Sequence, residues 1–123
     1  MDLGDLAGKF VLVTGASRGI GAAVARGFAH HGAHVAIHWH SARAAAEAVA
    51  ADIRARGVRA EALQADLSDA AAPARLVEEV VARFGRLDVL VNNAGDLVAR
   101  HAMVDTPDEM LEAIYRLNIR SVV

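Results

Sequence analysis

The sequence predicts an α/β protein in which a doubly wound parallel sheet carries helices on both faces. Short apolar runs, typical of buried parallel strands, alternate with segments of helical periodicity along the chain. Connections of crossover length favour parallel strands, and right-handed crossovers give the strand order 3-2-1-4. A glycine-rich turn at residues 14–21 joins the first strand to the first helix. We therefore expect a ligand at the carboxyl ends of strands one and four, where the strand order reverses.

Length and composition restrict the 123 residues to a single domain, residues 1–123. A hydrophobic content of 54% and a net charge of −2 exclude a disordered chain and one that coats nucleic acid. The absence of cysteine excludes disulfides, thiolate zinc sites and cysteine nucleophiles. No apolar run is long enough to span a membrane, and residues 1–9 do not resemble a signal peptide. We expect a cytoplasmic location and neither a membrane nor a nucleic-acid partner.

The amino-terminal third predicts a strand, a helix and a second strand. Residues 9–14 form the first strand, and residues 18–31 form a helix that ends at Gly32. Residues 35–39 form the second strand. The apolar face of the helix, at the i, i+4, i+8 spacing, is formed by Ile20, Val24 and Phe28.

The middle of the chain predicts a second helix and a third strand. Ser41 is expected to cap a helix that runs to about Arg56 and stops at Gly57. Residues 61–64 form a poorer strand. The apolar face of the helix is formed by Ala45, Val49 and Ile53.

The last third predicts two helices around a fourth strand. A helix opens at Ser68 or Asp69 and ends at Gly85, and residues 87–91 form strand four. Residues 106–109, Thr-Pro-Asp-Glu, are a capping box with proline at the first helical position. The apolar stripe of the first of these helices is Leu76, Val77, Val80, Val81 and Phe84, and that of the second is Met110, Ile114 and Leu117.

Residues 14–21, Thr-Gly-Ala-Ser-Arg-Gly-Ile-Gly, suit the binding of phosphate. The first N–H groups of a helix lack intrahelical partners, the helix dipole is positive there, and glycine lets a pyrophosphate approach the backbone. The spacing is neither that of a Walker loop nor Gly-x-Gly-x-x-Gly. A tight surface turn is the alternative, but the strand before the motif and the helix after it favour a nucleotide cofactor.

The end of the second strand predicts NADP rather than NAD. NAD-binding proteins place a carboxylate about 20 residues past the glycine loop to accept from the ribose 2′-OH. Residues 38–41, His-Trp-His-Ser, contain none, and the next acid is Glu47. The side chains that would meet a 2′-phosphate are those of Arg18, His40, Ser41 and Arg43. The alternative is that these are solvated polar residues at a strand end.

Residues 14–21, residues 92–95 (Asn-Asn-Ala-Gly), Asp66 and Asn118 stand in register, and with them the chain resembles a short-chain dehydrogenase/reductase of Rossmann fold. The resemblance covers essentially all 123 residues and is strongest to the 3-oxoacyl-(acyl-carrier-protein) reductase type. It implies an NADP-dependent oxidoreductase that reduces a small-molecule carbonyl or acyl thioester by hydride transfer.

The resemblance also implies roles for individual residues. Asp66 would accept from the adenine amino group, Leu67 would pack nearby, and Asn118, the one catalytic residue predicted, would hold a water in the proton relay. The full set of predicted cofactor-binding residues is Thr14, Gly15, Ser17, Arg18, Gly19, Ile20, Gly21, His40, Ser41, Asp66, Leu67, Asn92, Asn93, Ala94 and Gly95.

The chain departs from the family at the proton donor. The family uses a serine and a Tyr-x-x-x-Lys pair, because a tyrosine with an ordinary pKa of about 10 needs a neighbouring cation to act at neutral pH. The one tyrosine, Tyr115, is followed four residues later by Ile119, the one lysine is Lys9, and Ser121 stands too early for the catalytic serine. We expect the amino-terminal half of a reductase, truncated before its fifth strand and inactive alone.

The expected truncation would leave an apolar, unpaired edge on the fourth strand. The helix that carries Asn118 would be the last element of the chain and would keep only part of its packing. We therefore expect a homo-oligomer or self-association through that strand edge, which a monodisperse monomer in sedimentation at micromolar concentration would contradict.

Five histidines cluster at His30, His31, His34, His38 and His40. Strand alternation places the last three on one side, but alternate strand residues span too far for three zinc ligands. We predict helix-end and surface histidines and no metal. Two other functions stay open: a non-catalytic dinucleotide-binding module and a remnant without function of its own.

Overall fold

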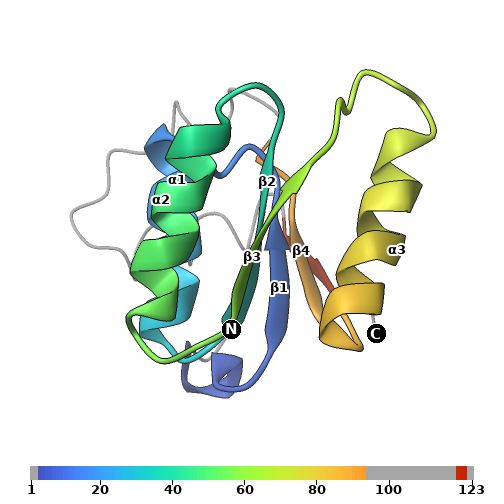
Figure 1. Cartoon of the computed structure of the whole chain (residues 1–123). Helices are drawn as coiled ribbons and strands as arrows, with labels where there is room; N and C mark the ends of the chain where they lie inside the picture. Colours follow the sequence, from blue (N-terminus) through green and yellow to red (C-terminus); the bar gives the residue numbers. More distant parts are fainter. Residues whose placement is uncertain (1–2, 94–118, 122–123) are drawn as a thin grey trace.

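The structure of the chain, a computed structural model, describes residues 3–93 and 119–121. It is a three-layer α/β arrangement with one central sheet (Figure 1). The strands are β1 (Phe10–Val13), β2 (His34–Trp39), β3 (Ala60–Gln64), β4 (Val89–Val91) and β5 (Ile119–Ser121). The helices are the 3-10 helix η1 (Leu3–Leu6) and the α-helices α1 (Gly19–His30), α2 (Arg43–Arg54) and α3 (Ala72–Phe84).

The sheet has the order β3-β2-β1-β4-β5, in which β1 to β4 are mutually parallel. The predicted order 3-2-1-4 is therefore confirmed. The helices α1 and α2 cover one face, and α3 covers the other (Figure 1). The sheet's carboxyl edge is the edge from which α1 begins, and strand order reverses there between β1 and β4.

Two apolar clusters lie on the two faces of the sheet. The strand β1 serves both, because Val11 and Val13 point toward α1 and α2, whereas Leu12 points toward α3. A strand that is covered on both faces has no polar positions, which explains the continuous apolar run in the sequence. The largest side chain buried under α1 is Phe28, and on the other face Leu12 packs with Leu63 and Val80.

The fourth strand does not have the unpaired edge that the sequence analysis predicts. Residues 119–121 form β5, which pairs antiparallel to β4 with Val91 opposite Ile119 and Val89 opposite Ser121. The expectation of a helix continuing to the end of the chain and of a sheet ending at strand four is therefore wrong. The main-chain groups on the outer edge of a strand require partners, and an extended segment of the same chain supplies them here. The predicted helix face of Met110, Ile114 and Leu117 lies outside the described residues.

Helix ends follow the prediction less closely than helix positions. Ala42, not Ser41, is the N-cap of α2, and no side chain caps it. The helix α3 starts at Ala72, later than predicted, because Asp66 and Asp69 each accept the N–H two residues on, from Ser68 and Ala71. Such local bonds hold the chain in turns instead of a helix. Gly85 ends α3 in the left-handed conformation at φ 90, as predicted.

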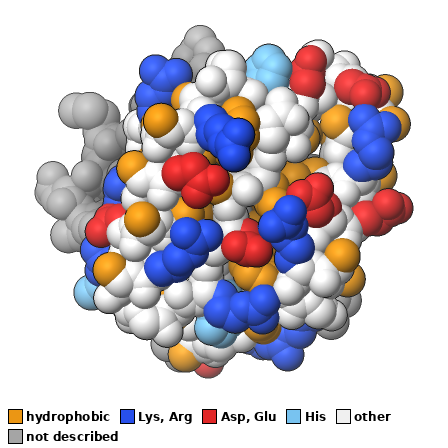
Figure 2. Space-filling model, viewed as in Figure 1, with side chains coloured by type: hydrophobic (Ala, Val, Ile, Leu, Met, Phe, Trp, Pro, Cys, Tyr) orange, Lys and Arg blue, Asp and Glu red, His pale blue; other side chains and the backbone are white. Residues whose placement is uncertain are grey.

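The surface around the sheet carries interspersed positive and negative side chains on the face shown in Figure 2. Glu61 on β3 bridges Arg54 of α2 and Arg83 of α3, with nitrogen–oxygen distances of 3.4 and 3.3 Å. One large apolar side chain among the described residues, that of Val81, is exposed (40% accessible), so the buried stripe of α3 is narrower than predicted. No helix within residues 3–93 combines the length and apolarity needed to cross a membrane.

Candidate functional site

The loop between β1 and α1 is the first part of the candidate site. Gly15 and Gly19 have φ values of 60 and 58, a region that residues with a side chain rarely adopt. Gly21 is needed for a different reason: a Cβ there would overlap the Gly15 carbonyl oxygen and lie 2.6 Å from Asn93 Nδ2. The glycines therefore shape this loop and the first residues of α1, and we call residues 14–21 together the glycine loop.

Two amides at the start of the glycine loop are not available to a ligand. The Gly15 N–H donates to His38 Nδ1 at 2.9 Å, and the Ala16 N–H donates to the His38 carbonyl oxygen at 3.0 Å. These two amides therefore already have acceptors within the protein. The first amides of α1, from Gly19 onward, have no intrahelical acceptor by helix geometry. The N-cap Arg18 supplies no side-chain cap, so the free donors lie at the start of α1.

The buried Thr14 joins the ends of β1 and β4. Its Oγ1 accepts the Asn93 N–H at 2.9 Å and lies 3.3 Å from Asn92 Oδ1. The Thr14 N–H donates to the Val91 carbonyl oxygen at 3.0 Å, and Asn93 Nδ2 donates to the Gly15 carbonyl oxygen at 3.4 Å. The predicted residues Thr14, Asn92 and Asn93 therefore come together and fix the distance between the glycine loop and β4.

Replacing Thr14 with valine is expected to lower the free energy of unfolding by about 1–3 kcal/mol. Valine has nearly the same shape, but it leaves the Asn93 N–H without its acceptor. Urea denaturation of the wild type, Thr14→Val and Thr14→Ser measures the effect. Serine keeps the hydroxyl and should retain most of the stability; equal losses in both variants would contradict the role of the hydrogen bond.

The turn after β3 forms the second part of the candidate site. Asp66 Oδ1 accepts the Ser68 hydroxyl at 2.6 Å and the Ser68 N–H at 3.0 Å. These two hydrogen bonds lower the pKa of the Asp66 carboxyl, so it is ionised at neutral pH. His40 Nε2, at the end of β2, lies 3.8 Å from Asp66 Oδ2. The structure thus brings together His40 and Asp66, which the sequence singled out for separate reasons.

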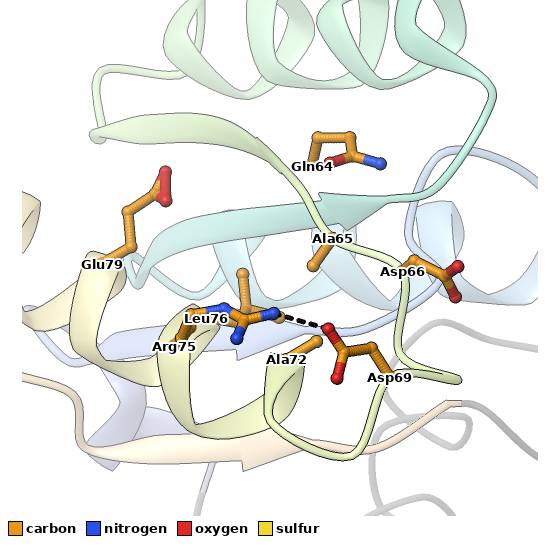
Figure 3. A pocket seen from close by; sticks show the side chains of 8 residues that line it. All are labelled: Gln64, Ala65, Asp66, Asp69, Ala72, Arg75, Leu76 and Glu79. Atoms are coloured by element: carbon orange, nitrogen blue, oxygen red, sulfur yellow. Dashed lines mark hydrogen bonds and ion pairs between the residues drawn. The ribbon is translucent and has the colours of Figure 1, made fainter.

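Two cavities lie on the α3 side of these turns. The polar one, of about 370 Å³, has Asp66 and Asp69 at one end and Glu79 at the other, and the Arg75 guanidinium reaches Asp69 Oδ2 at 2.7 Å (Figure 3). The apolar one, of about 220 Å³, is lined by Thr14, Asn92 and Leu67 together with side chains of β1, β4 and α3. Leu67, predicted to pack near a cofactor, therefore lies beside Thr14 and Asn92.

The histidines His34 and His38, which the sequence analysis places on one side of a strand, have different hydrogen-bond partners. His34 Nδ1 accepts the Arg59 N–H at 3.0 Å, and burial together with Arg59 and Arg86 lowers the pKa of His34. His38 is only 5% exposed, so its interpretation as a surface histidine is wrong. Among residues 3–93 and 119–121, no three histidine or carboxylate side chains are grouped as metal ligands would be.

Not every predicted residue falls in the described part of the chain. Ser17, Arg18 and Ile20 lie on the glycine loop, and Ser41 is exposed just beyond β2. Ala94, Gly95 and Asn118 lie outside the described residues. Sequence reasoning missed the role of His38. The signal that could have indicated it is the position of this polar residue inside the apolar run of residues 35–39.

Comparison with known proteins places this geometry in a family. The short chain dehydrogenase family matches residues 9–123. An uncharacterized oxidoreductase of Methylorubrum extorquens is 44% identical over 121 residues, which are 98% of this chain and 48% of that protein. The 3-oxoacyl-[acyl-carrier-protein] reductase of Staphylococcus aureus is 49% identical over 87 residues, which are 71% of this chain and 35% of that protein. The chain thus spans at most about half the length of these relatives.

Solved structures also resemble this chain. A short chain dehydrogenase from Burkholderia cenocepacia in complex with NADP has a TM-score of 0.70 and 43% identity, and the match covers 91% of this chain and 46% of that one. A blue fluorescent protein from a metagenomic library, in complex with NADPH, has a TM-score of 0.70 and 46% identity over 73% of this chain and 37% of that one.

Proposed function

The chain belongs to the short chain dehydrogenase family, and from this premise we propose that residues 1–123 are one dinucleotide-binding domain of an NADP-dependent oxidoreductase. The observation that carries the proposal is the glycine loop, whose shape is set by Gly15, Gly19 and Gly21 beside the end of β4. The free donors at the start of α1 and the helix dipole suit a pyrophosphate.

The turn after β3 suits the adenine end of a dinucleotide. Ser68 occupies Asp66 Oδ1 with two hydrogen bonds, which leaves Oδ2 to accept from an amino group. The carboxylate is ionised at neutral pH because these bonds lower its pKa, and it is thus an acceptor only. On this proposal Ala94 and Gly95 follow β4 where the cofactor ribose passes, and Leu67 packs beside the adenine.

We expect NADPH to bind more tightly than NADH. The end of β2 offers no carboxylate for a ribose 2′-OH; His40, Ser41 and Arg43, which follow in the sequence, are exposed, as is Arg18 in the glycine loop. A guanidinium that meets a 2′-phosphate contributes about 1.5–3 kcal/mol, or about 10- to 150-fold in affinity. Both solved structures compared above hold NADP or NADPH, which supports this preference.

Isothermal titration with NADPH and NADH tests the preference. Arg18→Ala should weaken NADPH binding by about tenfold or more and NADH binding by less, since a pyrophosphate contact alone would affect both equally. Arg56→Ala, past the end of α2 at the opposite edge of the sheet, is the matched control and should change neither. Tighter binding of NADH by the wild type would overturn the preference for NADP.

The proposed reaction of the whole enzyme is hydride transfer from NADPH to a carbonyl or a 3-oxoacyl thioester. NADPH would supply the hydride when bound; on this proposal the chain's own residues bind and orient the cofactor, and Asn118 would hold a water in the proton relay. Tyr115 has no lysine four residues on, so we propose that these 123 residues bind the cofactor but do not reduce a ketone by themselves. NADPH oxidation by this chain with a ketone would overturn that statement.

A non-catalytic dinucleotide-binding module is the second candidate, favoured by the same lack of a tyrosine–lysine pair. Adding a carboxy-terminal half from a relative separates the two candidates: recovered NADPH oxidation supports the reductase. Cytoplasmic location and the oligomeric state stay predictions, and the latter no longer has an unpaired β4 edge as its cause.

A further inference from the structure

His38 is the last buried residue of β2, and it joins three separate segments of the site. Its Nδ1 accepts the Gly15 N–H at 2.9 Å, and its Nε2 lies 2.8 Å from the Ala65 carbonyl oxygen. Its own carbonyl oxygen accepts the Ala16 N–H at 3.0 Å. His38 therefore fixes the positions of Gly15 and Ala16, at the start of the glycine loop, and of Ala65, the residue before Asp66.

These partners admit one protonation state of the ring. The Ala65 carbonyl can only accept, so Nε2 carries the hydrogen and donates it. The Gly15 N–H can only donate, so Nδ1 must be unprotonated. A charged imidazolium would place two N–H groups against each other, and the loop amide or the ring would have to move.

We propose that neutral His38 is the positioning residue of the dinucleotide site: its Nε2–H tautomer holds the Gly15 amide in place and ties the glycine loop to the turn that carries Asp66, so that cofactor binding requires this ring uncharged. The inference rests on the proposed function for its ligand. The geometry it invokes does not depend on the ligand, because both contacts are between protein atoms.

The surroundings of His38 oppose its charging. Burial lowers the pKa of His38, and His40 lowers it further, whereas the hydrogen bond to the Ala65 carbonyl raises it. The other charged groups on the elements that meet this ring are Asp66 in the turn after β3 and Arg18 in the glycine loop. The folded protein thus binds this proton less readily than the unfolded chain. The contribution of His38 to folding is therefore present above the unfolded value of 6.5 and is lost as pH falls from there through the lowered pKa.

The experiment compares NADPH affinity of this chain between about pH 8 and about pH 5.5 in the wild type, His38→Asn and His34→Asn. In the wild type, affinity should fall by about tenfold per pH unit below the pKa of His38, in addition to any titration of the 2′-phosphate. His38→Asn keeps an acceptor oxygen toward Gly15 but does not titrate, so its affinity should change less with pH.

His34→Asn is the matched control. His34 also accepts a main-chain N–H through Nδ1 and also has a pKa lowered by burial, but it stands at the far end of the same strand, away from the glycine loop. It should keep the wild-type pH dependence of binding. The same pH dependence in wild type and His38→Asn would overturn the proposal.

Imidazole 15N chemical shifts, assigned by the loss of the His38 signal in His38→Asn, test the geometry without a ligand. We expect the Nε2–H tautomer at neutral pH; an Nδ1–H tautomer or a charged ring would overturn the proposal even if every variant folds. Failure of the wild type to bind NADPH at either pH would instead overturn the proposed function. The statement that cofactor binding requires an uncharged His38 ring would then be overturned as well. The tautomer of His38 would still show whether the ring holds the Gly15 amide.

Discussion

Gly21→Ala is expected to weaken NADPH binding by about 10- to 100-fold and to lower the free energy of unfolding by about 1–3 kcal/mol. The added methyl would overlap the Gly15 carbonyl oxygen and press on Asn93 Nδ2, and a backbone atom cannot move aside as a flexible side chain can. Either the start of α1 or the Gly15 backbone must shift, and both belong to the glycine loop, the proposed pyrophosphate site. Isothermal titration and urea denaturation measure the two effects.

Substitutions at Gly19 provide the control, because Gly19 is constrained in a different way. A Cβ there would meet nothing within 4 Å, but its φ of 58 is strained for alanine. Asparagine tolerates this region better than alanine does. Gly19→Asn should therefore recover part of what Gly19→Ala loses, whereas Gly21→Asn should be as damaging as Gly21→Ala. Recovery at both positions would contradict the steric explanation for Gly21.

Phe28→Ala is expected to lower the free energy of unfolding by about 3–5 kcal/mol, the largest loss of stability for any single substitution discussed for this chain. The Phe28 ring is 0% exposed and lies between α1 and the sheet, in the cluster that contains Val11, Val13 and Ile37. Truncation leaves a cavity that a close-packed core fills only in part. Since α1 carries the proposed anion site at its start, NADPH affinity should fall as well.

Val81→Ala is the comparison for this core substitution. Val81 is the exposed large apolar residue of α3, and its truncation should change the free energy of unfolding by no more than about 0.5 kcal/mol. Urea denaturation midpoints of both variants and the wild type measure these two losses of stability. Similar midpoint shifts for Phe28→Ala and Val81→Ala would show that α1 does not pack on the sheet as described.

The order of the first four strands could be predicted because it depends on patterns local in the sequence. The strand β1 is apolar throughout since both its faces are covered, and crossover helices of the observed lengths leave few topologies. The glycine loop was recognisable for a similar reason, because the positive φ of Gly15 and Gly19 and the close approach of Gly21 to the Gly15 carbonyl oxygen all lie within residues 15–21. The family membership predicted from these residues is confirmed.

The features that were missed depend on partners far away in the sequence. Nothing near residues 119–121 indicates that β4 is their neighbour, and that pairing removed the expected open edge. Likewise the role of His38 depends on Gly15 and Ala65, each more than 20 residues away along the chain. The late start of α3 has a local cause, the turns at Asp66 and Asp69, which compete with a helix that the apolar periodicity alone would extend.

The central place of β1 has a consequence for how the protein opens. This strand is hydrogen-bonded on both edges, to β2 and to β4, and its residues Val11 and Val13 are fully buried. Its amides should therefore exchange with deuterium only when the whole domain unfolds, whereas those on the outer edge of β3 exchange through local fraying. The glycine loop follows directly on this most protected strand, so the proposed cofactor site should keep its shape while the outer edge of the sheet opens locally.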